Sequence, residues 1–141
     1  MNHKNLKVLS DYLLQLPTDY KNFDMGNFAI TSDEQNYVDP TNSPEVFCNT
    51  VACALGHGIL AGIKNEVGCY CWTEYGNNYL INSESENDRW LWCFSWDWEV
   101  VDNTHRGAGL RIKWLLENGL PENWRLQMKG IDRLCYLGEQ E

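Results

Sequence analysis

The sequence predicts a mainly α-helical single domain of four to five helices, with room for one small β-hairpin. Three observations support this fold class. The chain has 141 residues, which is the length of one domain. Its residues are 43% hydrophobic and 13% aromatic, enough to fill a core without a metal or a disulfide. Apolar side chains recur at helical spacing near the N-terminus and over residues 105–118.

The first predicted element is an amphipathic helix over residues 4–15, which Pro17 ends. Residues 18–44 show little periodicity and are rich in Asp, Asn, Ser and Gly. We therefore expect an irregular segment there, containing short strands or a functional loop. Apolar side chains should anchor both parts: Leu6, Leu9, Leu13 and Leu16 on the helix, and Phe23, Met25, Phe28 and Tyr37 in the irregular segment.

A second helix is expected over residues 45–62, because Pro44 and Glu45 suit a first helical turn and Gly62 suits an end. The β-forming residues of 68–81 flank a Gly-Asn turn, so the hairpin is expected there. Small residues four apart on the second helix should form a strip on which a flat ring can pack: Thr50, Ala54, Gly58 and Gly62.

The remaining helices are expected in the second half of the chain, after a polar loop over residues 82–88 and before a tail that begins at Gly138. A helix is predicted over residues 105–118, and a short final helix begins at Pro121. Residues 89–101 are rich in tryptophan, and their pattern is ambiguous between strand and helix. We favour helix because polar residues that can cap its start precede it: Ser85, Asn87 and Asp88.

The core is expected to form where the small-residue strip of the second helix meets the tryptophan-rich segment and the helix over 105–118. Neither an internal repeat nor a linker interrupts this arrangement. The parts are an N-terminal helix (1–16), a core region (45–121) and a C-terminal extension (122–141), all within a single domain, 1–141.

Charge and composition exclude several classes of function. The net charge of −9 argues against direct nucleic-acid binding. The sequence has neither an apolar run of signal-peptide type nor a span of about 20 apolar residues, so we expect a cytoplasmic protein that does not contact a membrane. The six cysteines should then be free, buried thiols. We expect no cofactor and no bound metal.

Residues 48–58 read Cys-Asn-Thr-Val-Ala-Cys-Ala-Leu-Gly-His-Gly. This segment resembles the Cys-Gly-Thr-x-x-Cys-x-x-Gly-His motif of a family of small, uncharacterised phage and bacterial proteins, with Asn49 in place of the Gly. The same proteins look similar in a Trp-rich segment, here 90–96, and in an Arg-Ile-x-x-Leu-Leu helix followed by Gly and Pro, here 111–121. The resemblance implies a phage or prophage origin, and hence the host cytoplasm, together with a mostly helical domain. It implies no catalytic residues.

Two alternatives arise from the cysteines. Cys53 and His57 lie four residues apart, which on a helix would allow the thiolate–imidazolium pair of a small Cys-His hydrolase. A zinc site from Cys48, Cys53, His57, Cys69 and Cys71 fits the usual spacing poorly. We therefore interpret Cys53 and His57 first as core residues and keep the hydrolase as an alternative.

The aromatic residues provide the main binding hypothesis. Stacked indoles beside arginines can hold a nucleotide-type ligand, since rings stack on bases and arginine binds phosphate. The expected site combines Trp90, Trp92, Trp96, Trp98, Arg106, Arg111 and His57. A tryptophan-rich core is the plainer interpretation of the same residues.

The preferred function is therefore a non-catalytic, phage-like accessory protein that binds a host protein or a small nucleotide-type ligand and counteracts host defence. A homo-oligomer is compatible with this function. A further alternative is an acidic DNA mimic that inhibits a nucleic-acid enzyme, suggested by the net charge and by a close row of acidic residues: Glu84, Glu86 and Asp88.

Overall fold

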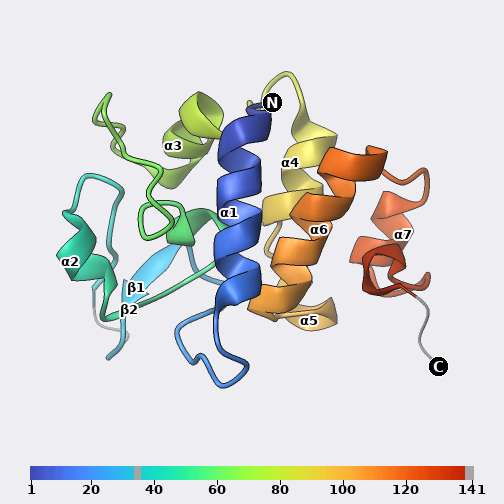
Figure 1. Ribbon diagram of the computed structural model, residues 1–141, viewed down its shortest axis with the longest axis horizontal. Helices are drawn as coiled ribbons and strands as arrows, with labels where there is room; N and C mark the ends of the chain where they lie inside the picture. Colours follow the sequence, from blue (N-terminus) through green and yellow to red (C-terminus); the bar gives the residue numbers. More distant parts are fainter. Residues whose placement is uncertain (34–35, 139–141) are drawn as a thin grey trace.

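Two long helices, α1 and α6, pack against each other along the middle of the molecule (Figure 1). The computed structural model describes residues 1–33 and 36–138, in which α1 spans His3–Gln15 and α6 spans His105–Asn118. Both helices lie where the periodic apolar residues predict them, so these two predictions are confirmed. Their facing side chains form the centre of the core: Leu6, Leu9 and Leu13 of α1, and Ala108, Ile112 and Leu115 of α6.

Polar side chains cap the start of both helices. The Asn2 side chain accepts a hydrogen bond from the backbone N–H of Asn5 at 3.0 Å. The Thr104 hydroxyl accepts one from the N–H of Gly107 at 2.9 Å. Each bond satisfies one of the N–H groups that the first turn of a helix leaves without an intrahelical partner.

Shorter elements cover the pair on two sides (Figure 1). On the side of α1 lie α2 (Pro44–Phe47), α3 (Trp72–Tyr79) and a 3₁₀ turn, η1 (Leu55–His57). On the side of α6 lie α4 (Asn87–Phe94), α5 (Trp98–Val101), α7 (Trp124–Met128) and a second 3₁₀ turn, η2 (Cys135–Leu137).

A small antiparallel sheet joins the irregular N-terminal segment to the motif segment. Strand β1 (Ala29–Thr31) pairs with β2 (Thr50–Ala52), with Ala29 opposite Ala52. The chain is therefore mostly helical with a small two-stranded sheet and forms a single domain, as the sequence predicts.

The predicted helix over residues 45–62 is wrong. Only Pro44–Phe47 is α-helical, and the chain then extends into β2 before the 3₁₀ turn Leu55–His57. The β-formers Thr50 and Val51 pair with a strand about twenty residues upstream, at 29–31, and this pairing overrides the local helical pattern.

The predicted hairpin over residues 68–81 is also wrong, because α3 occupies its centre. Trp72 and Tyr75 are fully buried and lie three residues apart, which places them on one face of a helix. Gly76, expected in a turn, lies within α3 and provides the space that the Trp90 ring fills.

The expected strip of small residues does not form, because its members lie on different elements. Two of the glycines in this segment are still explained by the close packing of neighbouring groups against them. A Cβ atom on Gly56 would collide with the carbonyl oxygen of Phe28, and one on Gly58 with the ring of Tyr75. The groups that approach are thus a backbone and a tyrosine rather than indoles, and the core is centred on α1 and α6 instead of residues 45–62.

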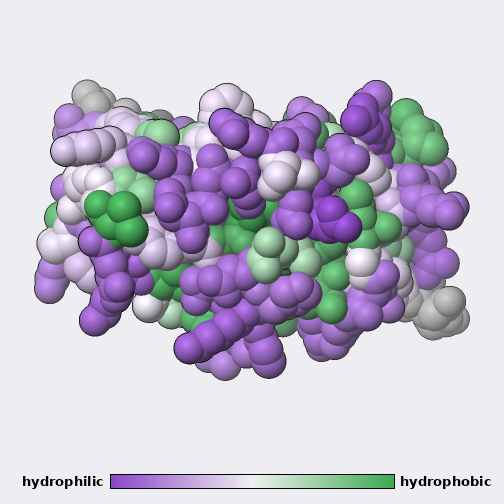
Figure 2. All heavy atoms as spheres, turned by 90° about the horizontal axis from the view of Figure 1, so that it is seen from above, coloured by the Kyte–Doolittle hydropathy of each residue, from purple (hydrophilic) through white to green (hydrophobic). Residues whose placement is uncertain are grey.

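Seen from above, the surface is largely hydrophilic, with smaller hydrophobic areas between the polar side chains (Figure 2). Within residues 1–33 and 36–138, none of the helices combines the length and the apolar character that crossing a bilayer requires.

Candidate functional site

The four tryptophans of the expected site do not line one slot. Trp92 and Trp98 are completely buried and pack edge to face, with ring centroids 5.4 Å apart. Trp90 is almost buried against α3. Trp96 lies on the surface, 58% exposed. The structure therefore brings Trp92 and Trp98 together as core residues and leaves Trp96 apart from them.

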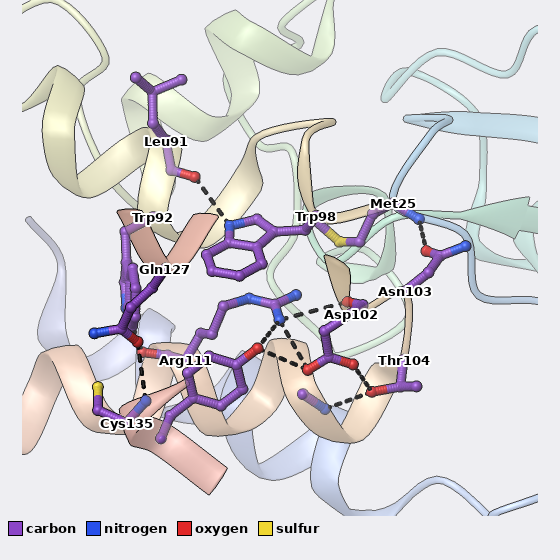
Figure 3. A network of polar contacts seen from close by, with 12 residues as sticks. Met25, Leu91, Trp92, Trp98, Asp102, Asn103, Thr104, Arg111, Gln127 and Cys135 are labelled. Carbon is purple, nitrogen blue, oxygen red and sulfur yellow. Dashed lines mark hydrogen bonds and ion pairs between the residues drawn. The ribbon is translucent and has the colours of Figure 1, made fainter. Parts of the chain in front are cut away.

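Arg111 lies inside this aromatic core rather than beside a ligand (Figure 3). Its guanidinium carbon is 4.1 Å from the centroid of the Trp98 ring and 5.2 Å from that of Tyr136. Its Nη1 donates to Asp102 Oδ2 at 3.2 Å and to the Tyr136 hydroxyl at 2.8 Å. Because no part of its side chain is exposed, Arg111 holds α6, α5 and η2 together and cannot contact a ligand.

Asp102 collects the polar contacts of this network (Figure 3). Its carboxylate accepts hydrogen bonds from Arg111, from the Tyr136 hydroxyl at 2.7 Å and from the Thr104 hydroxyl at 2.7 Å. Burial raises the pKa of Tyr136, which therefore stays protonated and keeps donating. Nε and Nη2 of Arg111 find no hydrogen-bond partner among the described residues.

Cys53 and His57 lie close together, but not as a nucleophile and its base. The His57 Nδ1 bonds the backbone carbonyl of Cys53 at 2.8 Å rather than its sulfur. Burial raises the pKa of the Cys53 thiol to about 11 and lowers the pKa of His57 to about 4. At neutral pH both groups are uncharged, which is the opposite of a thiolate–imidazolium pair.

The geometry of the described residues also gives no support to the zinc site or to the acidic DNA mimic. Over the described ranges, 1–33 and 36–138, no three His, Cys, Asp or Glu side chains gather in a way that could hold a metal ion. Of the acidic row, Glu86 pairs with the N-terminal ammonium at 3.2 Å and Asp88 with Arg125 at 3.7 Å. Two of its three carboxylates thus have intramolecular partners.

A cleft of about 560 Å³ lies where the end of α1 and the following loop meet the start of α6. Ligand sites in proteins commonly have volumes of about 300–1,000 Å³, so the cleft is of suitable size. Arg106 is the one residue of the expected site that lines it. The other lining residues are Leu14, Leu16, Thr18, Tyr20, Phe23, Asn103, Thr104, His105, Gly107 and Leu137.

His57 lies behind this cleft and fixes one of its walls. Because Nδ1 of His57 faces a carbonyl, which only accepts, this nitrogen carries the proton and Nε2 is the acceptor. Nε2 accepts a hydrogen bond from the Tyr20 hydroxyl at 2.8 Å. Burial raises the pKa of Tyr20 to about 12, so the hydroxyl remains a donor. His57 therefore positions Tyr20 without lining the cleft itself.

His105 is a buried residue that lines the cleft. Its Nδ1 lies 2.9 Å from the carbonyl oxygen of Leu13, and its Nε2 lies 3.0 Å from that of Pro17. Both ring nitrogens thus face backbone carbonyl oxygens, and these contacts tie the start of α6 to the end of α1 and the loop that follows it.

The start of α6 gives the cleft its positive character. The N–H groups of His105 and Arg106 lie in the first turn, where a helix has no intrahelical acceptor for them, and the helix dipole is positive at this end. Arg106 is exposed and, among the described residues, forms no ion pair. The cleft therefore combines an aromatic wall with an electropositive edge.

Sequence reasoning identified Arg106 and His57 but missed Tyr20, Phe23 and His105. Tyr20 and Phe23 lie in the aperiodic segment 18–44. Its aromatic residues indicated that the segment is anchored to the core, but they did not indicate a binding site. A second hollow of about 590 Å³ borders Arg133, but this arginine already donates to the Gly138 carbonyl at 2.6 Å.

Comparison with known proteins adds no further information: no family model, no curated protein and no solved structure matches this chain. The relation to small phage proteins therefore stays a prediction from the motif at residues 48–58, and the site is argued from its geometry.

Proposed function

We propose that this protein is a non-catalytic binding protein whose cleft at the start of α6 takes a small nucleotide-type ligand. The observation that carries the proposal is the convergence of Tyr20 and Phe23 with Arg106 and the first turn of α6 in one cleft. No cysteine lines the cleft, and the thiol of Cys53, the nucleophile of the hydrolase alternative, is buried and neutral. Binding without turnover is the function that suits this geometry best.

Each part of such a ligand has a matching group in the cleft. Stacking of a base on an aromatic ring is worth about 1–3 kcal/mol, which the rings of Tyr20 and Phe23 can supply. A phosphate placed at the start of α6 would meet free N–H groups, the positive end of the helix dipole and the guanidinium of Arg106. These local groups offset the repulsion that a chain of net charge −9 exerts on an anion.

The resemblance of the motif segment to phage proteins supports a cellular setting for nucleotide binding. An accessory protein in the cytoplasm of a bacterial host could sequester a signalling nucleotide and so weaken the response that the nucleotide triggers. This step of the proposal depends on the resemblance, whereas nucleotide binding depends on the cleft.

Calorimetric titration with a panel of mononucleotides and cyclic di- and trinucleotides tests the proposal. We expect at least one member to bind with unit stoichiometry and to remain unchanged after binding. Arg106→Ala should weaken that binding about 10- to 100-fold, because a charge-assisted hydrogen bond contributes about 1.5–3 kcal/mol. Lys113→Ala is the matched control, since Lys113 is an exposed cation of the same helix that does not line the cleft.

Two results would contradict the proposal. The first is a panel without any saturable binding. The second is an equal loss for Arg106→Ala and Lys113→Ala, which would indicate general charge attraction instead of a site. Consumption of the ligand would revive the hydrolase alternative, and in that case Cys53→Ala should abolish turnover.

A further inference from the structure

The surface beside α5 carries an exposed tryptophan, Trp96. Trp96 is 58% exposed, whereas Trp72, Trp92 and Trp98 are completely buried. Its ring packs against Phe28, with centroids 5.6 Å apart at an angle of 59°. A large aromatic side chain left in water is typical of a surface that another molecule covers, and tryptophan is enriched among residues that dominate binding energy.

Trp96 borders a shallow hollow of about 270 Å³ between the end of α4 and the start of α5. Phe28 and Trp90 form its aromatic part, and Asp97 lies at its edge. The hollow is smaller than most ligand sites, so it suits one or two side chains of a partner better than a whole small molecule.

Another carboxylate follows Trp96 in α5. The N–H of Glu99 bonds the carbonyl of Trp96 at 3.0 Å, so Glu99 follows one turn after the exposed ring. Its carboxyl group lies beside Gly26 and close to the Asp24 carboxylate, and this neighbour raises the pKa of Glu99. The Asp24 carboxylate is fixed by the Gly26 N–H at 2.9 Å and the Asn103 amide at 3.2 Å.

Over residues 1–33 and 36–138, these carboxylates have no paired counter-charge. Within the described part of the chain, neither Asp24, Asp97 nor Glu99 forms an ion pair with a lysine, arginine or histidine. Two carboxyl groups held together in this way repel each other once both are ionised, and a cation from outside would relieve the repulsion.

We propose that this face, defined by Phe28, Trp96, Asp97, Glu99 and Asp24, binds a basic segment of a partner protein. A lysine or arginine side chain would lie over the Trp96 ring with its charge toward the carboxylates, while an adjacent aliphatic residue enters the hollow. The same carboxylates repel nucleic acid and anionic lipid. They also disfavour a second copy of this chain, because a two-fold interface would place equal acidic groups opposite each other. None of these five residues lines the cleft, although Asn103 of the cleft donates to Asp24, and the surface goes beyond the proposed ligand.

The test is a titration of the full chain into a fluorescently labelled octapeptide of alternating lysine and leucine, followed by anisotropy. We expect saturable binding that weakens as salt rises, and no binding of the same peptide with glutamate in place of lysine. Trp96→Ala should weaken binding at least about 10-fold, as for a residue at the centre of an interface. Tyr70→Ala is the matched control, because Tyr70 is 81% exposed outside this face.

A double variant, Asp24→Asn with Glu99→Gln, separates charge from shape. It should weaken binding of the lysine peptide and flatten its salt dependence, while Arg106→Ala in the cleft should leave both unchanged. Equal binding by Trp96→Ala and Tyr70→Ala would overturn the proposal, as would binding of the glutamate peptide or the absence of saturation. Sedimentation provides one more check. A wild-type dimer that Trp96→Ala dissociates would assign the face to a second copy of this chain and would also overturn the proposal.

Discussion

At the scale of single residues, burial decides what His57 does. The ring is 1% exposed and lies between the carbonyl of Cys53 and the hydroxyl of Tyr20. Both contacts suit a neutral imidazole with its proton on Nδ1, and burial lowers its pKa from 6.5 to about 4. A histidine that looks like a catalytic base in the sequence is thus a neutral support for a tyrosine at the cleft.

The stability of the protein should depend on pH through this residue. In the unfolded chain His57 binds a proton below about pH 6.5, whereas in the folded protein it does so only below about pH 4. As the pH falls through this window, the unfolded state binds the extra proton, so the free energy of unfolding decreases. The loss should reach about 3 kcal/mol at pH 4, and there should be no contribution from His57 above pH 7.

Urea unfolding at about pH 7 and about pH 4.5, on the wild type and on His57→Gln, measures this contribution. Carboxylates titrate in both proteins, so the difference between their pH dependences isolates His57. The variant should lose less stability on acidification than the wild type. Identical losses would mean that His57 is not the buried neutral group described above.

At the scale of elements, the pair α1–α6 depends on a close approach of two backbones. The Ser10 hydroxyl of α1 donates to the carbonyl of Gly109 at 2.9 Å. A Cβ atom on Gly109 would lie 2.8 Å from Cγ of Leu14 and 3.2 Å from the carbonyl oxygen of Ser10. A helical glycine, which costs about 1 kcal/mol relative to alanine, is therefore required by packing.

Gly109→Ala should destabilise the protein by about 1–3 kcal/mol, because overpacking at the helix contact outweighs the gain in helix propensity. The midpoint of urea unfolding measures the change. Lys113→Ala, at an exposed position of the same helix, should stay within about 0.5 kcal/mol of the wild type. A Gly109→Ala protein as stable as Lys113→Ala would show that the contact between the two helices accommodates a methyl group without cost.

The two long helices were predictable because their signals are local: leucines on one face, a cap before the start and a proline or glycine after the end. The segment 45–62 was not, because its apolar run suits a helix or a buried strand equally. Its partner, β1 (Ala29–Thr31), lies in a segment without periodicity. Residues 72–79 were missed for a different reason, since Gly76 looks like a turn but serves the packing of Trp90.

The site was predictable only in part. Sequence shows which side chains can stack or carry charge, but Trp92, Trp96 and Trp98 differ in burial rather than in type. Arg106 and Arg111 differ in the same way: the first borders the cleft, and the second lies within a ring of aromatic side chains. Burial depends on contacts between distant segments, which residue spacing does not encode.

At the scale of the whole molecule, the six cysteines fall into distinct environments. All six are free thiols, and the expectation that they are buried does not hold for Cys48 and Cys71, which are exposed. Burial raises the pKa of Cys93 to about 12, as it raises that of Cys53. A cysteine reacts as the thiolate and only where the reagent can reach it. The exposed thiols of Cys48 and Cys71 should therefore react much faster than the buried ones.

Labelling of the native protein with iodoacetamide, followed by mass spectrometry, should modify Cys48 and Cys71 first. Cys53, Cys69 and Cys93 should react only after unfolding, with Cys135, which is half-buried, in between. The denatured, unlabelled protein provides the total of six thiols. Rapid modification of Cys53 in the native state would contradict the buried position assigned to it.

The uneven burial of the tryptophans also has an optical consequence. Trp114 is half-buried and the other indoles, Trp96 apart, are shielded from water, so most of the intrinsic emission of this protein should lie at short wavelength. The long-wavelength edge should come mainly from Trp96, and iodide should quench that edge selectively. The fluorescence of Trp96 therefore reports on one point of the surface. A molecule that binds there should shift the emission of Trp96 to shorter wavelength.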